Sequence, residues 1–449
     1  MMHRMLDALA ILLFGVGLVR AQEPRNHSLA TPGEVVPQAE KIFIVPAAVY
    51  EVERAAPYRP AAITTVDFRD SSSVPSNVSA EDFKEPRPTD GFRFWARGEY
   101  LLWRVTGAPV AVPLVTTNNP PAIGALNEPG TTVLFGAGSG PDVNFGKFSG
   151  GRVTIGAWLE DDHEYSLEAT AFLLQRRGFL FSASTVGGGA QVVSIPFNAT
   201  DPFNGNPAGE SALNAGAAPS SATVYLASRL FGGELNETIH LWSTETFYWS
   251  TLLGFRYVGL REELTLTHSS HDAGNSGTLS VNDAYATRSQ FYGGQLGTRF
   301  GMSVGRFGLE TAVKVAVGSS SQVVNINGNT IVTNGAFGFA NGTTIGGLFA
   351  LPSNIGTTGH MVFAVVPELT FKASVALTPR IRSYVAYQGL YVSNAARPGN
   401  QIDRTINPNL NPFFVPPGNL VGTAAPLATT IRESSLWAQG LQVGLEIRY

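Results

Sequence analysis

From Gly91 to the last residue, Tyr449, apolar side chains recur at every second position in one segment after another. The final segment, 435–449, is the clearest, with apolar residues on one face and polar residues on the other: Leu441, Val443, Leu445 and Ile447 against Gln442, Glu446 and Arg448. Residues i and i+2 share a face in an extended chain, so this alternation predicts β-strands with one apolar and one polar face. A soluble β-sandwich would show the same alternation.

Ten segments of this kind occur, with no helical pattern between them. We expect strands at 92–105, 152–160, 165–173, 228–238, 248–266, 291–300, 307–317, 363–373, 380–390 and 435–449. The links between them alternate in length, short at 161–164, 240–246, 301–305 and 376–378 and long at 106–151, 174–227, 267–287, 318–360 and 391–434. Short turns at one rim and long loops at the other are typical of outer-membrane barrels.

We therefore predict an all-β fold, an antiparallel transmembrane β-barrel of about ten strands with long outer loops and short periplasmic turns. Thr- and Val-rich pieces of the long loops, such as 322–333, allow twelve strands instead. The chain stops on an aromatic residue, Tyr449, as outer-membrane barrels commonly do for recognition by their assembly machinery. The expected partners are thus outer-membrane lipid and the barrel assembly machinery, which would bind the C-terminal strand.

Composition agrees with this fold class. Only 14% of the residues are charged, against about 25% in an ordinary soluble domain. No apolar stretch approaches the 18 or more residues that a spanning helix needs. The net charge of -4 gives no sign of a nucleic-acid partner, and the absence of cysteine excludes disulfides, zinc–thiolate sites and thiol catalysis.

The first 90 residues differ in composition and lack this alternation. Arg4 precedes a run at 6–18 that is apolar apart from Asp7, and Ala21 ends an A-x-A-like site, so we expect a signal peptide at 1–21. Residues 22–90 are rich in proline, and only 41–49 has the composition of a strand. We expect a mostly disordered periplasmic extension, either a plain linker or an arm that binds peptidoglycan or a partner.

Charged side chains on the polar faces are expected inside the barrel, because a Lys or Arg facing lipid at mid-depth costs about 2–4 kcal/mol. The predicted lumen-lining residues are Arg97, Glu99, Arg152, Glu168, Arg256, Glu310, Lys314, Glu368, Lys372, Glu446 and Arg448, with Glu160 at a strand end. Opposite signs at matching depths predict cross-strand ion pairs. Such pairs could simply fill the lumen, or they could form a constriction that sets ion preference. Because about eight strands leave an interior just filled by side chains, ten strands favour small-ion passage or a loop-plugged barrel.

Aromatic residues lie in or at the ends of the expected strands. Girdles of Trp and Tyr are expected at headgroup depth, whereas a soluble protein would use the same residues in its core. The residues are Trp95, Tyr100, Trp103, Tyr248, Trp249, Tyr257, Tyr292, Tyr384, Tyr387, Tyr391, Trp437 and Tyr449.

Five short segments also carry a resemblance. FWARGEYLLW at 94–103 resembles the opening strand of a planctomycete-type family of outer-membrane β-barrel porins, the BBP type. Its later markers are similar to segments found here in the same order, at 254–257, 291–297, 396–403 and 437–441. The resemblance covers roughly 90–449 and implies the fold and an outer-membrane location. It implies transport only weakly and brings no catalytic residues.

An enzyme would need a base near a nucleophile or a paired acid, and no such arrangement is apparent. The one histidine pair, His268 and His271, is expected in a solvated flexible loop rather than at a metal, and the glycine-rich piece 136–140 reads as a flexible loop. We therefore expect no enzymatic activity and no cofactor. The expected function is a narrow porin-like channel for ions or small solutes. The alternative is a non-conducting structural or adhesive barrel that acts through its long surface loops, for example 335–342; the oligomeric state is left open.

Overall fold

The computed structural model describes residues 93–140, 142–160, 164–188, 191–216, 218–411, 414 and 430–449. The predicted signal peptide and the extension at 22–90, with its strand candidate at 41–49, lie outside the described residues. The helical elements of the described part are three 3-10 turns, η2 (Ala336–Gly338), η3 (Pro398–Asn400) and η4 (Pro408–Leu410). None of the described helices has the length and apolar character needed to span a membrane.

The main sheet has 12 strands, of which ten close into a ring. In ring order these are β1 (Phe94–Val105), β4 (Lys147–Trp158), β5 (Tyr165–Leu174), β9 (Ser220–Ser243), β10 (Phe247–Asp272), β11 (Gly277–Val304), β12 (Phe307–Thr333), β14 (Gly356–Ala376), β15 (Ile381–Ala396) and β17 (Glu433–Arg448). Every neighbouring pair is antiparallel, and β17 pairs with β1 to close the barrel. The prediction of ten antiparallel strands is confirmed, and the piece 322–333 continues β12 instead of adding strands.

The two ends of the described chain meet at the closure. The backbone N–H of Tyr449 donates to the carbonyl oxygen of Phe94 at 2.8 Å, and the N–H of Phe94 donates back at 3.2 Å. Closure pairs the backbone groups that an open sheet would leave at its edges. The C-terminal strand is therefore the last piece of the ring, with one neighbour from each end of the chain.

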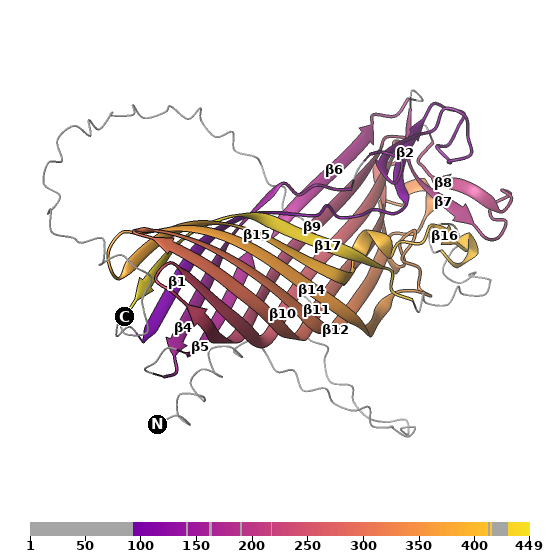
Figure 1. Cartoon of the computed structure of the whole chain (residues 1–449). Coiled ribbons are helices and arrows are strands. Elements are labelled where there is room, and N and C mark those ends of the chain that lie inside the picture. Colours follow the sequence, from indigo (N-terminus) through magenta and orange to yellow (C-terminus); the bar gives the residue numbers. More distant parts are fainter. Residues whose placement is uncertain are drawn as a thin grey trace, which may run out of the picture. The chain divides into compact units, whose positions relative to one another are not determined.

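The barrel wall is uneven in height (Figure 1). Strands β9 to β12 have 24 to 28 residues, whereas β1 and β4 have 12. A tilted strand of about 9–11 residues suffices to cross a bilayer, so the four tall strands continue well beyond it. The prediction of a loop at 267–287 is therefore wrong, because β10 and β11 run through it and only 273–276 form a turn. Two further strands, β6 (Arg177–Thr185) and β13 (Gly342–Ile345), pair with the far ends of β9 and β12.

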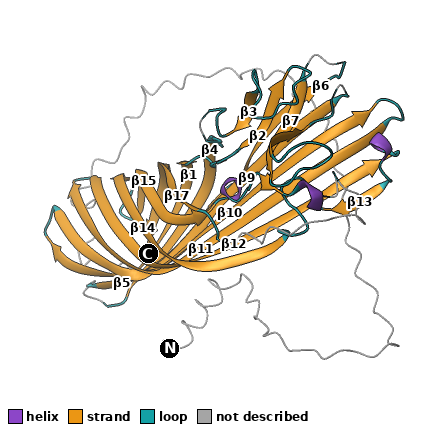
Figure 2. Ribbon diagram, turned by 90° about the vertical axis from the view of Figure 1, so that its right-hand side faces the viewer, coloured by secondary structure: helices purple, strands orange, loops and turns teal. Residues whose placement is uncertain are grey.

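Long connections build a second, five-stranded sheet at the end of the barrel opposite the short turns (Figures 1 and 2). Its strands are β2 (Pro113–Asn118), β3 (Thr132–Gly136), β7 (Val192–Ala199), β8 (Gly209–Leu213) and β16 (Thr405–Ile406). We call this sheet, together with the segments 346–351 and 397–411, the plug. Plug residues such as Leu114, Ile195 and Phe349 share one buried apolar cluster with inner-face residues of the tall strands.

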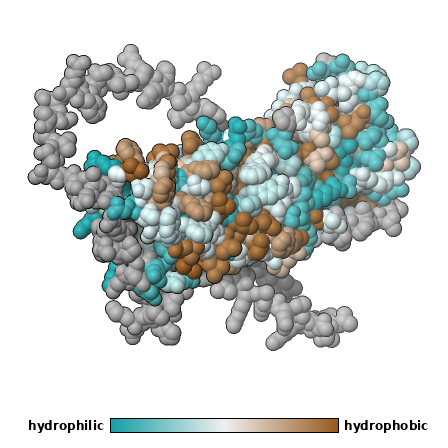
Figure 3. Space-filling view, in the orientation of Figure 1, coloured by the Kyte–Doolittle hydropathy of each residue, from teal (hydrophilic) through white to brown (hydrophobic). Residues whose placement is uncertain are grey.

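The outer wall of the half nearer the short turns is apolar, and Figure 3 shows hydrophobic surface gathered there. On β10, β11 and β12 this belt covers 247–257, 292–304 and 307–317. Its exposed side chains include Val153, Ile155, Leu253, Phe255, Leu296, Phe300, Leu309, Val313, Val315, Val317, Phe363, Phe371, Leu441, Val443 and Leu445. Large exposed apolar surface of this extent identifies the belt as the part that lipid covers.

Beyond the belt the two faces of β10 and β11 exchange character. On β10 the inner side chains become apolar and buried, as at Leu260, Leu264 and Leu266, while the outer ones become polar, as at Thr265 and Thr267. The inward face of β11 changes in the same way, from Gln295 within the belt to Val281 beyond it. The lower barrel is thus apolar outside and polar inside, and the upper barrel has the reverse arrangement because it encloses the plug.

Candidate functional site

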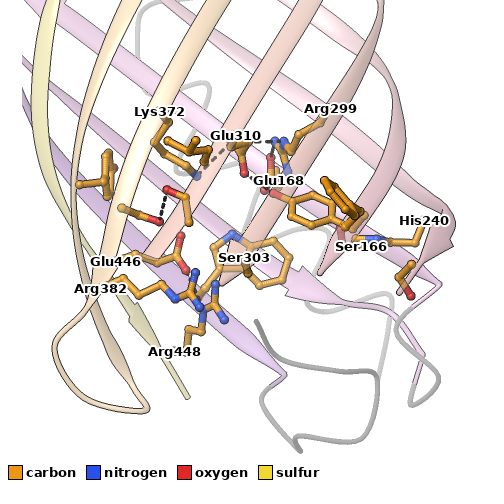
Figure 4. A pocket seen from close by; sticks show the side chains of 18 of the residues that line it. Ser166, Glu168, His240, Arg299, Ser303, Glu310, Lys372, Arg382, Glu446 and Arg448 are labelled. Atoms are coloured by element: carbon orange, nitrogen blue, oxygen red, sulfur yellow. Dashed lines mark hydrogen bonds and ion pairs between the residues drawn. The ribbon is translucent and has the colours of Figure 1, made fainter. Parts of the chain in front are cut away.

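A cavity of about 380 Å³ opens inside the barrel at the short-turn end (Figure 4). Aromatic residues such as Trp95, Trp158 and Tyr248 line it together with charged ones such as Arg382 and Arg448. We call this cavity the vestibule. A second cavity of about 70 Å³ continues from it, and six side chains line both: Arg97, Glu168, Arg299, Glu310, Lys372 and Tyr384.

The first group of charges lies where the two cavities meet. Glu168 on β5 accepts from Arg299 on β11, with Nη2 and Oε2 2.8 Å apart, and also lies 3.5 Å from Nη1 of Arg97. Glu310 forms an ion pair with Lys372 at 3.0 Å and accepts a hydrogen bond from the hydroxyl of Tyr248 at 2.5 Å. Strands β5 and β11 are not neighbours in the ring, so the Glu168–Arg299 pair crosses the lumen.

A second group lies deeper in the barrel. Lys314 on β12 holds Glu234 on β9 at 2.6 Å and Glu368 on β14 at 3.0 Å. Arg256 on β10 pairs with the same two carboxylates, and Gln295 donates to Glu234 at 2.9 Å. Lys314–Glu368 and Arg256–Glu234 join neighbouring strands in register, whereas Lys314–Glu234 and Arg256–Glu368 join strands three places apart in the ring. The second kind of contact reaches across the lumen, so side chains fill it at this depth.

The third group lines the wall formed by β4, β1, β17 and β15. Arg152 pairs with Glu99 at 3.4 Å, and Glu99 also accepts from the hydroxyl of Tyr384 at 2.8 Å. Glu446 forms ion pairs with both Arg97 and Arg448, each at 2.6 Å. We call the three groups together the charged layer.

All eleven residues predicted to line the lumen belong to the charged layer, and each makes at least one ion pair there. Glu160, in contrast, lies past the end of β4 and is exposed. Sequence reasoning missed Glu234 as a partner and did not assign Arg299 to the lumen, although Arg299 lies on the polar face of its segment. The register places Glu234 opposite Arg256, but that register depends on a turn whose length the sequence pattern does not fix.

The positive and negative charges of the charged layer nearly cancel. Its ion pairs join six carboxylates (Glu99, Glu168, Glu234, Glu310, Glu368 and Glu446) to seven cations (Arg97, Arg152, Arg256, Arg299, Lys314, Lys372 and Arg448). Moving one charge out of water costs several kcal/mol unless partners compensate. Each charged group of the layer has an opposite charge within reach, which offsets the cost of its burial.

Two titratable side chains of the tall strands contact the plug beyond the belt. His268 on β10 is buried, and its Nε2 lies 3.2 Å from the carbonyl oxygen of Val193 in β7, while burial lowers its pKa to about 4. Asp283 on β11 accepts three backbone N–H groups of 348–350, and burial raises its pKa to about 6. The prediction of a solvated loop around His268 is therefore wrong, because His268 lies on β10 and is buried. The sequence did not indicate a strand here because the outward residues of β10 are Ser and Thr, which give no apolar alternation.

Within the described part of the chain, no three His, Asp or Glu side chains come close enough to hold a metal ion together. The glycine-rich piece 136–140 begins at the last residue of β3, and Gly136, Gly138 and Gly140 have positive φ values. The next element of the described chain is the strand β4 and not a helix, unlike the strand-to-helix turn that binds phosphate.

A closed antiparallel ring, an apolar outer belt and a polar interior define this chain as a β-barrel of the outer-membrane type. The sequence model of the family described as "Putative beta barrel porin-7 (BBP7)" matches residues 95–449, so the chain belongs to that family. The family resemblance noted in the sequence is confirmed.

Solved outer-membrane barrels resemble the chain only distantly. The outer membrane protease OmpT from Escherichia coli is 12% identical, covers 83% of this chain and 100% of its own, and has a TM-score of 0.38. The toluene transporter TbuX from Ralstonia pickettii is 10% identical over 81% of this chain and 92% of its own, with a TM-score of 0.19. A FadL homologue from Pseudomonas aeruginosa is 8% identical over the same shares, with a TM-score of 0.21. No curated protein matches.

Proposed function

We propose that the protein resides in the outer membrane as a narrow channel for ions or small polar solutes, closed in the conformation described here. The observation that carries the proposal is the continuous polar path from the vestibule into the charged layer within the lipid-covered half. The vestibule has room for a small solute, and the six residues shared with the inner cavity form its narrow exit. A charged wall of this kind selects ions by charge and size.

Closure has a specific cause in this proposal. Pairs such as Arg256–Glu368 and Lys314–Glu234 join strands that are not neighbours, so they bridge the lumen. Passage requires these bridges to rearrange and the plug to shift. We therefore expect conductance far below that of wide porins, whose 16–18 strands leave an aqueous channel.

Recordings from single proteins in planar bilayers test the channel directly. The double variant Arg256→Gln/Glu368→Gln removes one bridge without changing net charge and should increase the conductance or the open fraction. The matched control is Arg404→Gln/Glu210→Gln, which removes an ion pair of 2.7 Å within the plug and should leave the charged layer unchanged. Equal effects of the two double variants would contradict the assignment of the bridge as the constriction.

Ion preference gives a second readout. Replacing Lys314 and Lys372 by Gln changes the layer from one excess cation to one excess carboxylate, so reversal potentials should shift toward cation preference. An unchanged preference would show that ions do not pass this layer.

The second candidate is a non-conducting barrel that presents the plug and the tall strands to the exterior. The observation in its favour is the apolar cluster that joins the plug to the upper wall, because a core of this kind resists displacement. Complete absence of current steps at every voltage, in the wild type and in the bridge variant alike, would refute the channel and favour this candidate.

A further inference from the structure

Three arginines form a row on the outer face of the tall strands. Arg229 on β9 pairs in register with Arg261 on β10, and Arg261 pairs with Arg288 on β11. All three side chains are exposed. Directly opposite residues in neighbouring strands have Cβ atoms about 5 Å apart, and like charges at that separation destabilise a sheet.

The row has no internal compensation. Among the residues that the structure describes, none of the three guanidinium groups forms an ion pair. The nearby carboxylate on the same face, Glu263, pairs with another exposed cation, Arg176. A row of like charges without counter-charges favours the binding of an anion from outside the chain.

The position of the row identifies which anion. A second row, of aromatic rings, lies two to four residues nearer the belt on the same strands: the ring centroids of Phe231 and Tyr257 are 5.9 Å apart, and those of Tyr257 and Tyr292 are 5.1 Å apart. Aromatic rows of this kind lie at the level of lipid headgroups. The guanidinium of Arg261 lies 5.4 Å from the centre of the Phe231 ring, so the two rows are in direct contact.

Basic residues continue at the same rim around part of the ring. Arg104 on β1 and Lys147 on β4 are opposite in register and exposed, and Arg176 follows β5. The basic rim is thus an arc that runs from β1 through β4, β5, β9 and β10 to β11. The arc is one-sided, since the residue of β12 opposite Arg288 in register is Val323, which carries no charge.

We propose that the arginine row Arg229, Arg261 and Arg288 binds the phosphate groups of an anionic lipid in the membrane leaflet on the plug side. Guanidinium groups bind phosphate in a two-point geometry, and the aromatic row and the belt below accept the acyl chains. The lipid would neutralise the like charges that the sheet places side by side. This binding site is separate from the lumen and does not depend on whether the barrel conducts.

The test uses the full-length protein in a non-ionic detergent, titrated with diphosphoryl lipid A and followed by native mass spectrometry. The triple variant Arg229→Gln/Arg261→Gln/Arg288→Gln should bind this lipid less tightly than the wild type. A cation near an anionic surface contributes about fivefold in affinity, so the expected loss is on the order of a hundredfold. Heat-modifiable gel mobility checks that the variant is folded, which we expect because it removes mutual repulsion.

The matched control removes three exposed arginines from the opposite rim, as Arg93→Gln/Arg306→Gln/Arg380→Gln, and should bind the lipid like the wild type. Lipid A without its phosphates should bind equally weakly to all three proteins, and inorganic phosphate at the same concentration should not compete.

The proposal is overturned if the row variant binds as tightly as the wild type, or if both triple variants lose the same affinity. It is also overturned if the phosphate-free lipid binds as well as the phosphorylated one, or if free phosphate displaces it. Tight binding of an acidic peptide without any lipid effect would assign the row to a protein partner instead. Should the triple variant fail to fold, Arg261→Gln alone should lose about fivefold, and Arg261→Lys less.

Discussion

Removing one member of the Glu262–Arg397 ion pair should weaken the attachment of the plug to the barrel wall. Arg397 follows β15, and its guanidinium makes a two-point contact with the carboxylate of Glu262 on β10, with Nη2 and Oε1 2.9 Å apart. The side chains are each only 1% exposed. The same guanidinium donates to the carbonyl oxygen of Gly107 at 3.3 Å, so it joins three separate segments of the chain.

The magnitude follows from burial. Replacing Arg397 by Met leaves a carboxylate buried without a counter-charge, which costs about 3–5 kcal/mol, and Glu262→Gln leaves the opposite defect at a similar cost. The double variant has no buried charge and loses mainly the hydrogen bond to Gly107, about 1 kcal/mol. The two substitutions should therefore be strongly non-additive, with a coupling free energy of at least about 4 kcal/mol.

Urea unfolding of the barrel in lipid vesicles, followed by tryptophan fluorescence, measures these differences, and protease cleavage at 397–411 reports whether the plug loosens first. The comparison pair is Glu210–Arg404, whose side chains are 29% and 12% exposed, and its removal should cost no more than about 1 kcal/mol. If the double variant at Glu262 and Arg397 is as unstable as the sum of its singles, the pair is not a coupled unit and the reasoning fails.

Three further outcomes are expected. Burial lowers the pKa of His268 to about 4, so on acidification the unfolded chain binds a proton at a higher pH than the folded chain does. The free energy of unfolding should therefore fall by up to about 3 kcal/mol between about pH 6.5 and pH 4. His268→Gln should abolish that acid-dependent loss in unfolding titrations. Because the raised pKa of Asp283 increases stability as the pH falls, the variant is compared with the wild type at each pH. Asp283→Ala leaves three buried N–H groups without an acceptor and should destabilise the plug by about 3 kcal/mol or more, seen as faster amide exchange at 346–351. Gly399→Ala would place a Cβ 2.2 Å from the carbonyl oxygen of Pro109, so the same exchange measurement should show 397–411 loosened, while Gly389→Ala, with open space around its Cβ, should have no effect.

The ring itself was predictable because lipid imposes a strict rule on the strands that it covers. Outward side chains have to be apolar and inward ones are polar, so Leu441 to Ile447 and Leu309 to Val317 show uninterrupted alternation. The ten predicted segments all became ring strands for this reason. The cross-lumen pairing could not be predicted, since Glu168–Arg299 and Arg256–Glu368 depend on barrel diameter and on register rather than on local pattern.

Beyond the lipid-covered belt this rule no longer applies, and the sequence pattern predicted strands that were too short there. The outer side chains of β10 from Thr265 to Ser269 are small and polar, which is also the composition of a loop. Two of their partners on β11 are also polar, Asn282 opposite Thr267 and Ser280 opposite Ser269. Thr267 donates to Asn282 at 2.8 Å, and Asn282 donates to Asn329 at 2.9 Å. The alternation continues in this part of the strand, but the apolar residues face inward and the polar residues face outward. A search for strands with apolar outer faces therefore misses it.

The reversal also explains why the family-like segment at 396–403 lies so far from the lipid. Arg397 fixes this segment to a barrel strand, and Gly399 and Gln401 attach it to the connections that follow β1 and precede β17. Arg397 binds Glu262, Gly399 allows the chain to approach Pro109, and Gln401 donates to the carbonyl oxygens of Arg397 and Arg432. None of these contacts touches the charged layer. The segment is therefore explained by attachment of the plug, and a search for residues that select solutes belongs in the charged layer.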